Sequence, residues 1–230
     1  MKTALLALGS GLMSLSPAMG AASFVNGSFN DNAAAYLVWP GYSGSVGGQG
    51  TASNPAAPTG WTVSATGSGI NSDAIIATDS IAGTAGIGGA NNPFIDNGAE
   101  SGAVLLLQGV AFASQNVTGF TVSQDYILTF DVNSRNCCGD VPQGQLSIGG
   151  VVAIPFTSIA PVGGSNPYNS ISVPFTASAA ALEFRIDSRS ASGGDATLLL
   201  DNFAIAMVPE PSTLAILGLS LSLFGRRRRE

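Results

Sequence analysis

The chain contains no histidine and few charged residues of any kind. Among its 230 residues, only 10% are Asp, Glu, Lys or Arg. Without histidine, a Ser-His-Asp or Cys-His catalytic group cannot be built, and neither can a histidine-ligated metal site. Paired carboxylates could still support glycoside hydrolysis, which needs only two of them. The acidic residues fall in no catalytic pattern, however, so the sequence does not predict an enzyme.

Basic residues are scarcer still once the two ends of the chain are set aside. Residues 23–207 contain no lysine, and three arginines stand against twelve acidic residues, a net charge of −9. Affinity for nucleic acid comes mostly from Lys and Arg on phosphates, so this composition excludes nucleic acid as a partner. An acidic, lysine-free surface instead favours an extracellular solute, calcium or a neutral polysaccharide.

A sustained helical repeat is also missing, and the sequence has the period of strands instead. Apolar and polar residues alternate over 126–133, 171–175 and 182–187. Gly149 and Gly150 form a hairpin turn signal between 145–148 and 151–155. Further strands are predicted at 24–29, 60–63, 103–108, 119–122 and 198–206. Many short strands separated by turns predict an all-β fold, a β-sandwich.

Two stretches of the core are rich in small residues. Residues 41–60 contain Gly, Ser, Pro and Ala, and residues 83–98 contain mostly Gly, Asn and small apolar residues. Both are predicted to be long surface loops. Such loops often carry binding function in sandwiches, and the alternative is a pair of insertions without a role.

The first 22 residues have the pattern of an export signal. Lys2 gives a short positive start, residues 4–15 are mostly apolar, and small residues follow. This order predicts a secretory signal peptide at 1–22, handled by the Sec machinery and cleaved between Gly20 and Ser23. The alternative, a retained transmembrane helix, needs a longer apolar stretch.

The last 23 residues, 208–230, form a segment distinct from the core at 23–207. Pro209, Glu210 and Pro211 precede an apolar run, and Arg226, Arg227, Arg228 and Arg229 follow it. The prolines favour an extended, exposed peptide. As a helix, the short hydrophobic segment spans roughly 20 Å, against about 30 Å of hydrocarbon. The arginines would hold its end in the cytoplasm. A plain anchor and a core helix with a basic end are the alternatives.

This tail resembles the PEP-CTERM sorting signal of Gram-negative bacteria. The resemblance implies that the chain is a substrate of exosortase, a membrane-embedded sorting enzyme. It also implies transient anchoring in the inner membrane through the tail's transmembrane helix. Delivery to the cell surface or the extracellular matrix, including a biofilm matrix, would follow.

Four short motifs follow one another along the core: Asn26-Gly27-Ser28-Phe29, Gly60-Trp61, the strand at 126–131 and Leu200-Asp201-Asn202-Phe203. In this order they resemble the galactose-binding-like jelly rolls, which include carbohydrate-binding modules. The resemblance implies eight or nine strands, with the first and last as neighbours and Trp61 in the core. It also implies a structural calcium where those strands meet, with Asn26, Asp31 and Asp201 as candidate ligands. The alternative is that Asp201 and Asn202 make only a turn or an edge contact.

Four aromatic residues are candidates for stacking on sugar rings: Tyr36, Trp39, Tyr42 and Tyr168. Ordinary packing against the sandwich is the alternative for each.

Cys137 and Cys138 are adjacent, and thiols oxidise outside the cytoplasm. They could form a strained disulfide that shapes a loop, make two intermolecular links, or stay free.

Two classes of function follow, and a third is weaker. The first is an exported surface or matrix protein whose jelly roll binds extracellular polysaccharide. The second is a structural matrix protein without a ligand. The third is a glycan hydrolase that depends on carboxylates.

Overall fold

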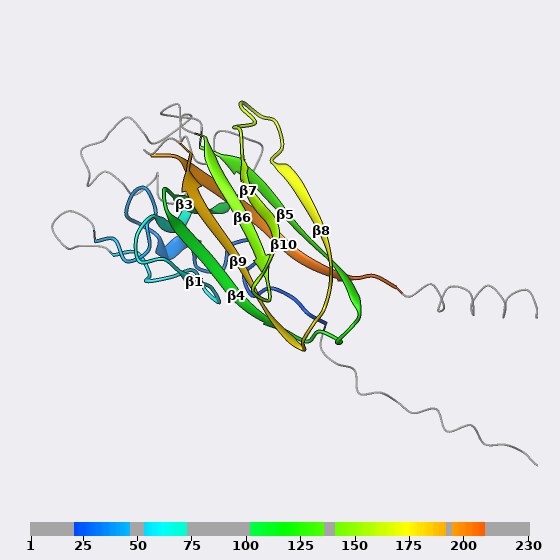
Figure 1. The fold of residues 1–230 in the computed structure, drawn as a ribbon. Coiled ribbons are helices and arrows are strands. Elements are labelled where there is room, and N and C mark those ends of the chain that lie inside the picture. The colour runs from blue at the N-terminus through cyan, green and yellow to red at the C-terminus, as the bar shows by residue number, and fades with distance from the viewer. Residues whose placement is uncertain (1–20, 47–52, 73–101, 136–140, 192–194, 210–230) are drawn as a thin grey trace, which may run out of the picture.

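Ten strands form two antiparallel sheets that pack face to face in the described part of the chain (Figure 1). The computed structural model describes residues 21–46, 53–72, 102–135, 141–191 and 195–209. The strands are β1 (Thr62–Val63), β2 (Ser68–Ser72), β3 (Ala103–Gln108), β4 (Ala111–Thr118), β5 (Asp125–Ser134), β6 (Pro142–Ile148), β7 (Val151–Ser158), β8 (Asn169–Thr176), β9 (Ala181–Ser190) and β10 (Thr197–Met207). A 3-10 turn, η1, covers Ala33–Ala35.

Each sheet has a long strand at its centre, β9 in one and β10 in the other. One sheet has the order β1-β4-β9-β6-β7 and is called the β9 sheet here; the other, β2-β3-β10-β5-β8, is called the β10 sheet. In β9, buried and exposed positions alternate, with Leu182, Phe184 and Ile186 facing inward. Because side chains on a strand point to opposite faces in turn, this alternation buries one face and leaves the other for a ligand or for solvent.

An aromatic cluster fills one part of the space between the sheets. Trp61 lies against Phe24, Phe29 and Phe203, with ring centroids 5.6, 5.1 and 5.2 Å away. The indole Nε1–H donates to the carbonyl of Asn26 at 3.2 Å, so the polar group of this buried ring is satisfied. Trp61 therefore lies in the core, as the sequence predicts.

The edges of the sheets are protected against pairing with other chains. The edge strands β7 and β8 contain Pro155 and Pro174, which cannot donate to a further strand. The edge of β2 is covered by the chain itself, because Ile70 N–H donates to the carbonyl of Gly41 at 3.0 Å. A Cβ atom at Gly69 would overlap that carbonyl, so glycine is required at this close approach.

The all-β sandwich predicted from the sequence is confirmed, and two individual strands are wrong. Residues 24–29 form turns rather than a strand, because Asn26 and Phe29 take positive φ angles of 52° and 56°. Residues 119–122 do not form a strand either: Gly119 and Phe120 both donate to the carbonyl of Ala180, and a turn begins at Val122. The strands β2 and β4, which are rich in Ser, Asn and other small or polar residues, were not predicted.

The neighbour of the last strand also differs from the one that the resemblance implies. The first strand, β1, pairs with β4 in the β9 sheet, while β10 lies in the other sheet. The segment before β1 takes the expected place instead, since Phe203 N–H donates to the carbonyl of Gly27 at 2.9 Å. The strand count is ten within the described residues rather than eight or nine.

The described part of the first predicted loop is firmly attached. Asn54 is 5% exposed, and its side chain makes four hydrogen bonds of 2.8–2.9 Å. It accepts from the backbone N–H groups of Leu37 and Val38 and donates to the carbonyls of Val38 and Tyr42.

The predicted loop at 83–98 lies outside the described residues. So do the predicted signal peptide up to residue 20 and the C-terminal apolar run. In the described ranges no helix is long and apolar enough to cross a membrane.

Candidate functional site

The outer face of the β10 sheet is covered by aromatic side chains at the end where β10 begins. Val104, Leu106 and Leu199 point outward from this sheet and have no exposed surface. Tyr168 completes the cluster, and Trp39, Tyr42 and Val162 pack against it. We call Trp39, Tyr42 and Tyr168 the aromatic cover. It brings together three of the four aromatic residues that the sequence singles out.

These aromatic residues offer little free ring surface. Tyr168 is 6% exposed, while Trp39 and Tyr42 are half-buried. Tyr36, the fourth candidate, is fully buried in the main core, where its hydroxyl lies 3.1 Å from Ser43 Oγ. Burial raises the pKa of Tyr36, and the hydrogen bond to Ser43 opposes that shift. The four rings therefore pack mainly within the protein.

An ion pair lies beside the aromatic cover. Arg135 is 7% exposed, and its Nη2 lies 2.7 Å from Asp195 Oδ2. The same Nη2 also donates to the Asp195 carbonyl. Burial raises the pKa of Tyr42; the negative charge of Asp195 adds to that shift, and Arg135 opposes it. The covered face is therefore a small second core with one buried charge.

The outer face of the β9 sheet is polar and open. On β9, the inward residues alternate with Glu183, Arg185, Asp187 and Arg189, which point outward. The guanidinium carbon of Arg185 lies 3.8 Å from the centroid of the Phe112 ring, and that of Arg189 lies 3.9 Å from the Phe156 ring. Two of the three arginines in residues 23–207 thus lie on this face, each stacked on a phenylalanine.

Hydrogen bonds fix the polar side chains of this face. Arg185 donates through Nε and Nη2 to the carboxylate of Asp187, with distances of 3.0 and 2.7 Å. This hydrogen bond to Asp187 raises the pKa of Arg185, so the guanidinium stays charged. Arg189 Nε donates to Gln143 Oε1 at 2.7 Å. Each guanidinium is therefore held by both a ring and an oxygen acceptor.

Strand register places further polar groups beside the arginines. Arg185 lies opposite Ser114 on β4 and Ser147 on β6, and Asp187 lies opposite Gln145. Donors and acceptors therefore run across three strands, with Phe112 and Phe156 on either side. We call this surface, Phe112, Gln143, Gln145, Phe156, Arg185, Asp187 and Arg189, the polar face. It can hydrogen-bond a hydroxyl-rich ligand laid across the sheet.

The sequence predicts only part of the polar face. The alternation over 182–187 predicts a strand there, but its charged residues are not among the candidate site residues. Phe112 was missed because β4 was not predicted as a strand. The available signal was the spacing of Arg185 and Arg189: four residues apart in an alternating strand, they must share one face.

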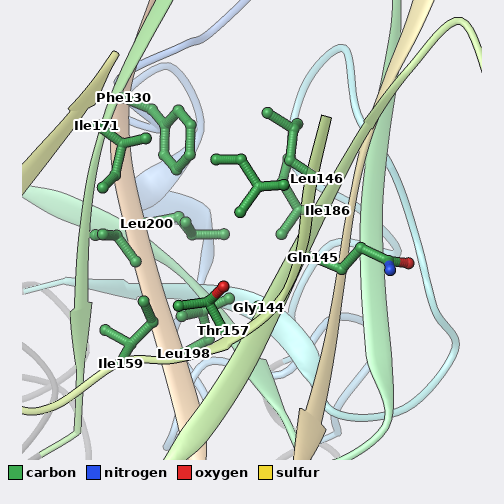
Figure 2. Close-up of a pocket in the computed structure, with 12 residues that line it drawn as sticks. Phe130, Gly144, Gln145, Leu146, Thr157, Ile159, Ile171, Ile186, Leu198 and Leu200 are labelled. Atoms are coloured by element: carbon green, nitrogen blue, oxygen red, sulfur yellow. The ribbon is translucent and has the colours of Figure 1, made fainter. Parts of the chain in front are cut away.

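An apolar pocket lies between the sheets, near the edge strands β7 and β8 (Figure 2). Its volume is about 80 Å³. Leu146 and Ile186 from the β9 sheet line it together with Phe130, Ile171 and Leu200 from the β10 sheet. Its lining is almost entirely aliphatic and aromatic, so it offers little for a polar ligand to bond to.

The candidate calcium ligands do not form an evident cation site. Asn26 Oδ1 accepts the backbone N–H of Asp31 at 3.0 Å, and Asp201 Oδ1 accepts that of Asn202 at 2.7 Å. The buried Asn26 Nδ2 is a donor, which a cation repels. Over the described ranges, no group of three or more acidic or cysteine residues is placed to hold a metal. A structural calcium stays a prediction, tested by the melting temperature with calcium and with a chelator.

The remaining predicted site residues lie mostly outside the described ranges. These are Cys137, Cys138, Glu210, Pro211 and Arg226, Arg227, Arg228 and Arg229. Their predicted roles, the disulfide among them, stay predictions. Pro209 is described and follows directly after Val208, whose N–H donates to the carbonyl of Asp125 at 2.9 Å.

Comparison with known proteins identifies the tail. Residues 208–229 match the model of the PEP-CTERM protein-sorting motif. The chain therefore carries this motif, which implies export with processing by an exosortase. No catalytic family was found, and no curated protein matches the chain.

Solved structures similar to the core include carbohydrate-binding modules. A family 35 module from Clostridium thermocellum is 10% identical, with a TM-score of 0.42 and coverage of 64% of this chain and 92% of the module. The CBM22-1 xylan-binding domain from Paenibacillus barcinonensis Xyn10C is 12% identical, with a TM-score of 0.39 and coverage of 67% and 89%. The sugar-binding C-terminal domain of EclA is 20% identical, with a TM-score of 0.34; the match covers 40% of this chain and 64% of that domain.

Proposed function

We propose that this protein is exported through the Sec machinery, processed by an exosortase, and binds extracellular polysaccharide through the polar face. Before processing, the tail holds it in the inner membrane. Afterwards it is located at the cell surface or in the extracellular matrix of a Gram-negative bacterium. The sandwich itself carries out no reaction.

The arrangement of the polar face is the observation that supports binding. Sugar hydroxyls need donors and acceptors, and the apolar faces of sugar rings need flat apolar partners. The Arg185–Asp187 pair offers both kinds of polar group in a fixed geometry. The half-buried rings of Phe112 and Phe156 lie under the guanidinium groups of Arg185 and Arg189. Because partners already hold these side chains, ligand binding would order few of them, which lowers its entropic cost.

Charge favours a neutral polymer over an acidic one. Residues 23–207 carry a net charge of −9, which repels a polyanion at long range. Arg185 already has a carboxylate partner in Asp187, so its charge is balanced locally. An uncharged chain gains hydrogen bonds on this face without that repulsion.

The weaker hydrolase hypothesis finds little support on the same face. Glu183 and Asp187 are its two outward carboxylates on β9. Four residues along a strand separate their Cα atoms by about 13 Å. Glycosidases hold their carboxyl groups about 5–9.5 Å apart. In addition, Asp187 is engaged by Arg185 and is poorly placed to act as an acid.

Affinity electrophoresis of the protein in gels that contain the host exopolysaccharide tests the proposal. Phe156→Ala on the polar face should weaken retention about tenfold, the ratio that corresponds to 1.4 kcal/mol. Tyr42→Ala is the matched control, because Tyr42 is also a half-buried aromatic residue but lies on the other sheet. Equal retention of the two variants would contradict this site. No retention of the parent protein on any neutral polysaccharide would favour the structural matrix protein.

A further inference from the structure

The end of the sandwich from which the tail departs has features that the polysaccharide proposal does not use. We propose that this end is a contact surface for the membrane-embedded sorting enzyme itself. The inference rests on the sorting part of the proposed function and is independent of the polysaccharide. We call this surface the tail end; it comprises residues 119–124, the start of β5, the end of β8, Met207 and Val208.

The folded domain holds the chain up to the first residue of the motif. Val208 N–H donates to the carbonyl of Asp125 at 2.9 Å, and Gln124 Nε2 donates to the Val208 carbonyl at 2.7 Å. Both polar backbone groups of Val208 are thus bonded to the sandwich. The matched motif begins at this same residue. No linker separates the fold from the sorting signal.

Covalent geometry then limits how far the motif can reach. An extended chain advances at most about 3.6 Å per residue, so Pro211 lies within about 11 Å of Val208 whatever its conformation. The two prolines also restrict how that short segment can bend. An enzyme that holds Pro209, Glu210 and Pro211 must therefore come against the tail end, unless the end of β10 separates from β5.

Separation of the strand is opposed by the packing around it. Register pairs Met207 with Tyr126 and Ala206 with Ile127 before Val208 reaches Asp125. Tyr126 is 4% exposed, stacks on Phe175 with centroids 5.7 Å apart, and accepts the N–H of Thr121 through its hydroxyl at 3.0 Å. The structure therefore favours contact with the intact end over local unfolding.

The tail end has the apolar surface that such a contact needs. Val122 is 54% exposed and Met207 is 61% exposed. A hollow of about 400 Å³ lies beside Val208, lined also by Asp125, Pro174, Phe175 and Thr176. Thr176 Oγ1 donates to Asp125 Oδ1 at 2.6 Å, which fixes one wall of the hollow. In Figure 1, this region lies at the lower right, where the orange strand β10 leaves the sheet.

The test compares two exposed valines at opposite ends of the sandwich. Val122 lies at the tail end, and Val110 lies in the β3–β4 turn at the other end, where it is 87% exposed. The full-length precursor is followed by pulse-chase in its host. Val122→Asp should slow processing about tenfold, and Val110→Asp should leave its rate unchanged. Equal rates for the two variants would overturn the contact surface.

Two further variants separate this proposal from the sorting claim. Replacing Pro209, Glu210 and Pro211 with alanine should abolish processing whether or not the surface exists; if it does not, the sorting claim fails. If that variant blocks processing but Val122→Asp does not slow it, only the contact surface fails. An insertion of ten Gly and Ser residues between Val208 and Pro209 should make processing insensitive to Val122→Asp. Persistent sensitivity would contradict the proposal.

A membrane surface is the competing occupant for an apolar patch, and a bilayer-free assay distinguishes it. The precursor is incubated with the purified sorting enzyme in detergent micelles. The proposal predicts that the difference between Val122→Asp and Val110→Asp persists there. A difference seen only in lipid vesicles would assign the patch to the lipid and overturn the proposed contact.

Discussion

The outer faces of the two sheets differ in the way their aromatic residues are used. On the β10 sheet, Trp39, Tyr42 and Tyr168 pack onto Val104, Leu106 and Leu199 and close the surface. On the β9 sheet, Phe112 and Phe156 lie under arginines on a face that no described loop closes. Aromatic residue type alone would select the first face as a binding site. The surrounding contacts select the second.

The difference shows why burial must be weighed before an aromatic residue is assigned to a ligand. A Tyr or Trp ring that covers apolar strand residues already has its partner, and exposing it would lose that burial energy. A ring that stacks on an arginine guanidinium, as Phe112 and Phe156 do, instead has hydrogen-bonding groups next to it that a ligand can contact. The following predictions separate the two faces, from the largest expected effect to the smallest.

Leu199→Ala should lower the free energy of unfolding most, because it leaves a cavity in the second core beneath the aromatic cover. Leu199 has no exposed surface, and Leu→Ala at such sites typically costs about 3 kcal/mol of unfolding free energy. Urea denaturation measures the loss. Retention on polysaccharide below the transition should not change. A parallel loss of retention in the folded protein would mean that the covered face also binds.

Asn54→Ala should loosen the cover without removing any of its rings. The substitution removes four hydrogen bonds that hold the chain around Val38 and Tyr42 and leaves the two N–H donors of Leu37 and Val38 unpaired. We expect a loss of about 2 kcal/mol, since buried unpaired groups cost about 1–3 kcal/mol. Faster hydrogen exchange at residues 37–43 should accompany the loss. Uniform acceleration over the whole domain would instead indicate a global effect.

Phe112→Ala should affect stability less and binding more. Its ring is half-buried and stacks on Arg185, an interaction worth about 0.5–1 kcal/mol at exposed sites. We expect about 1 kcal/mol lower stability and a clear loss of retention in affinity electrophoresis. Phe112→Leu, which keeps apolar bulk without the ring, is the control for packing. If the leucine variant retains full binding, stacking on the ring is not required.

The sequence predicted the sandwich well because three of its strands show a clear alternation of buried and more exposed positions. The strands at 126–133, 171–175 and 182–187 all coincide with β5, β8 and β9. It missed β2 and β4, whose buried positions hold mostly Ser, Gly, Asn, Gln and Ala, with one large apolar residue each, Ile70 and Val117. Asn26 and Phe29 could not be recognised as turn residues, since a positive φ at phenylalanine is set by tertiary contacts.

The polar face was less predictable than the fold for a related reason. A site formed across β4, β9, β6 and β7 depends on strand order, and order between non-consecutive strands is not encoded in local periodicity. The sorting motif is the opposite case: its residues are consecutive, so its composition and spacing were enough.

The smallest expected effect that distinguishes the two faces is a loss of stability at alkaline pH. Burial raises the pKa of Tyr42 and of Tyr36 above 10, the ordinary value for tyrosine. Below that pH both tyrosines are neutral whether the chain is folded or unfolded, and their contribution to stability is fully present. Above it, the unfolded chain loses these protons first, so stability falls as the pH rises through the folded pKa values.

Urea midpoints between about pH 9 and pH 11 should therefore decrease, and Tyr42→Phe should make the dependence of the midpoint on pH shallower. Arg185→Gln on the polar face should leave the slope unchanged, because Arg185 stays protonated throughout this range. A slope that Tyr42→Phe does not alter would show that Tyr42 is not desolvated, and the cover would then be more open than its packing indicates.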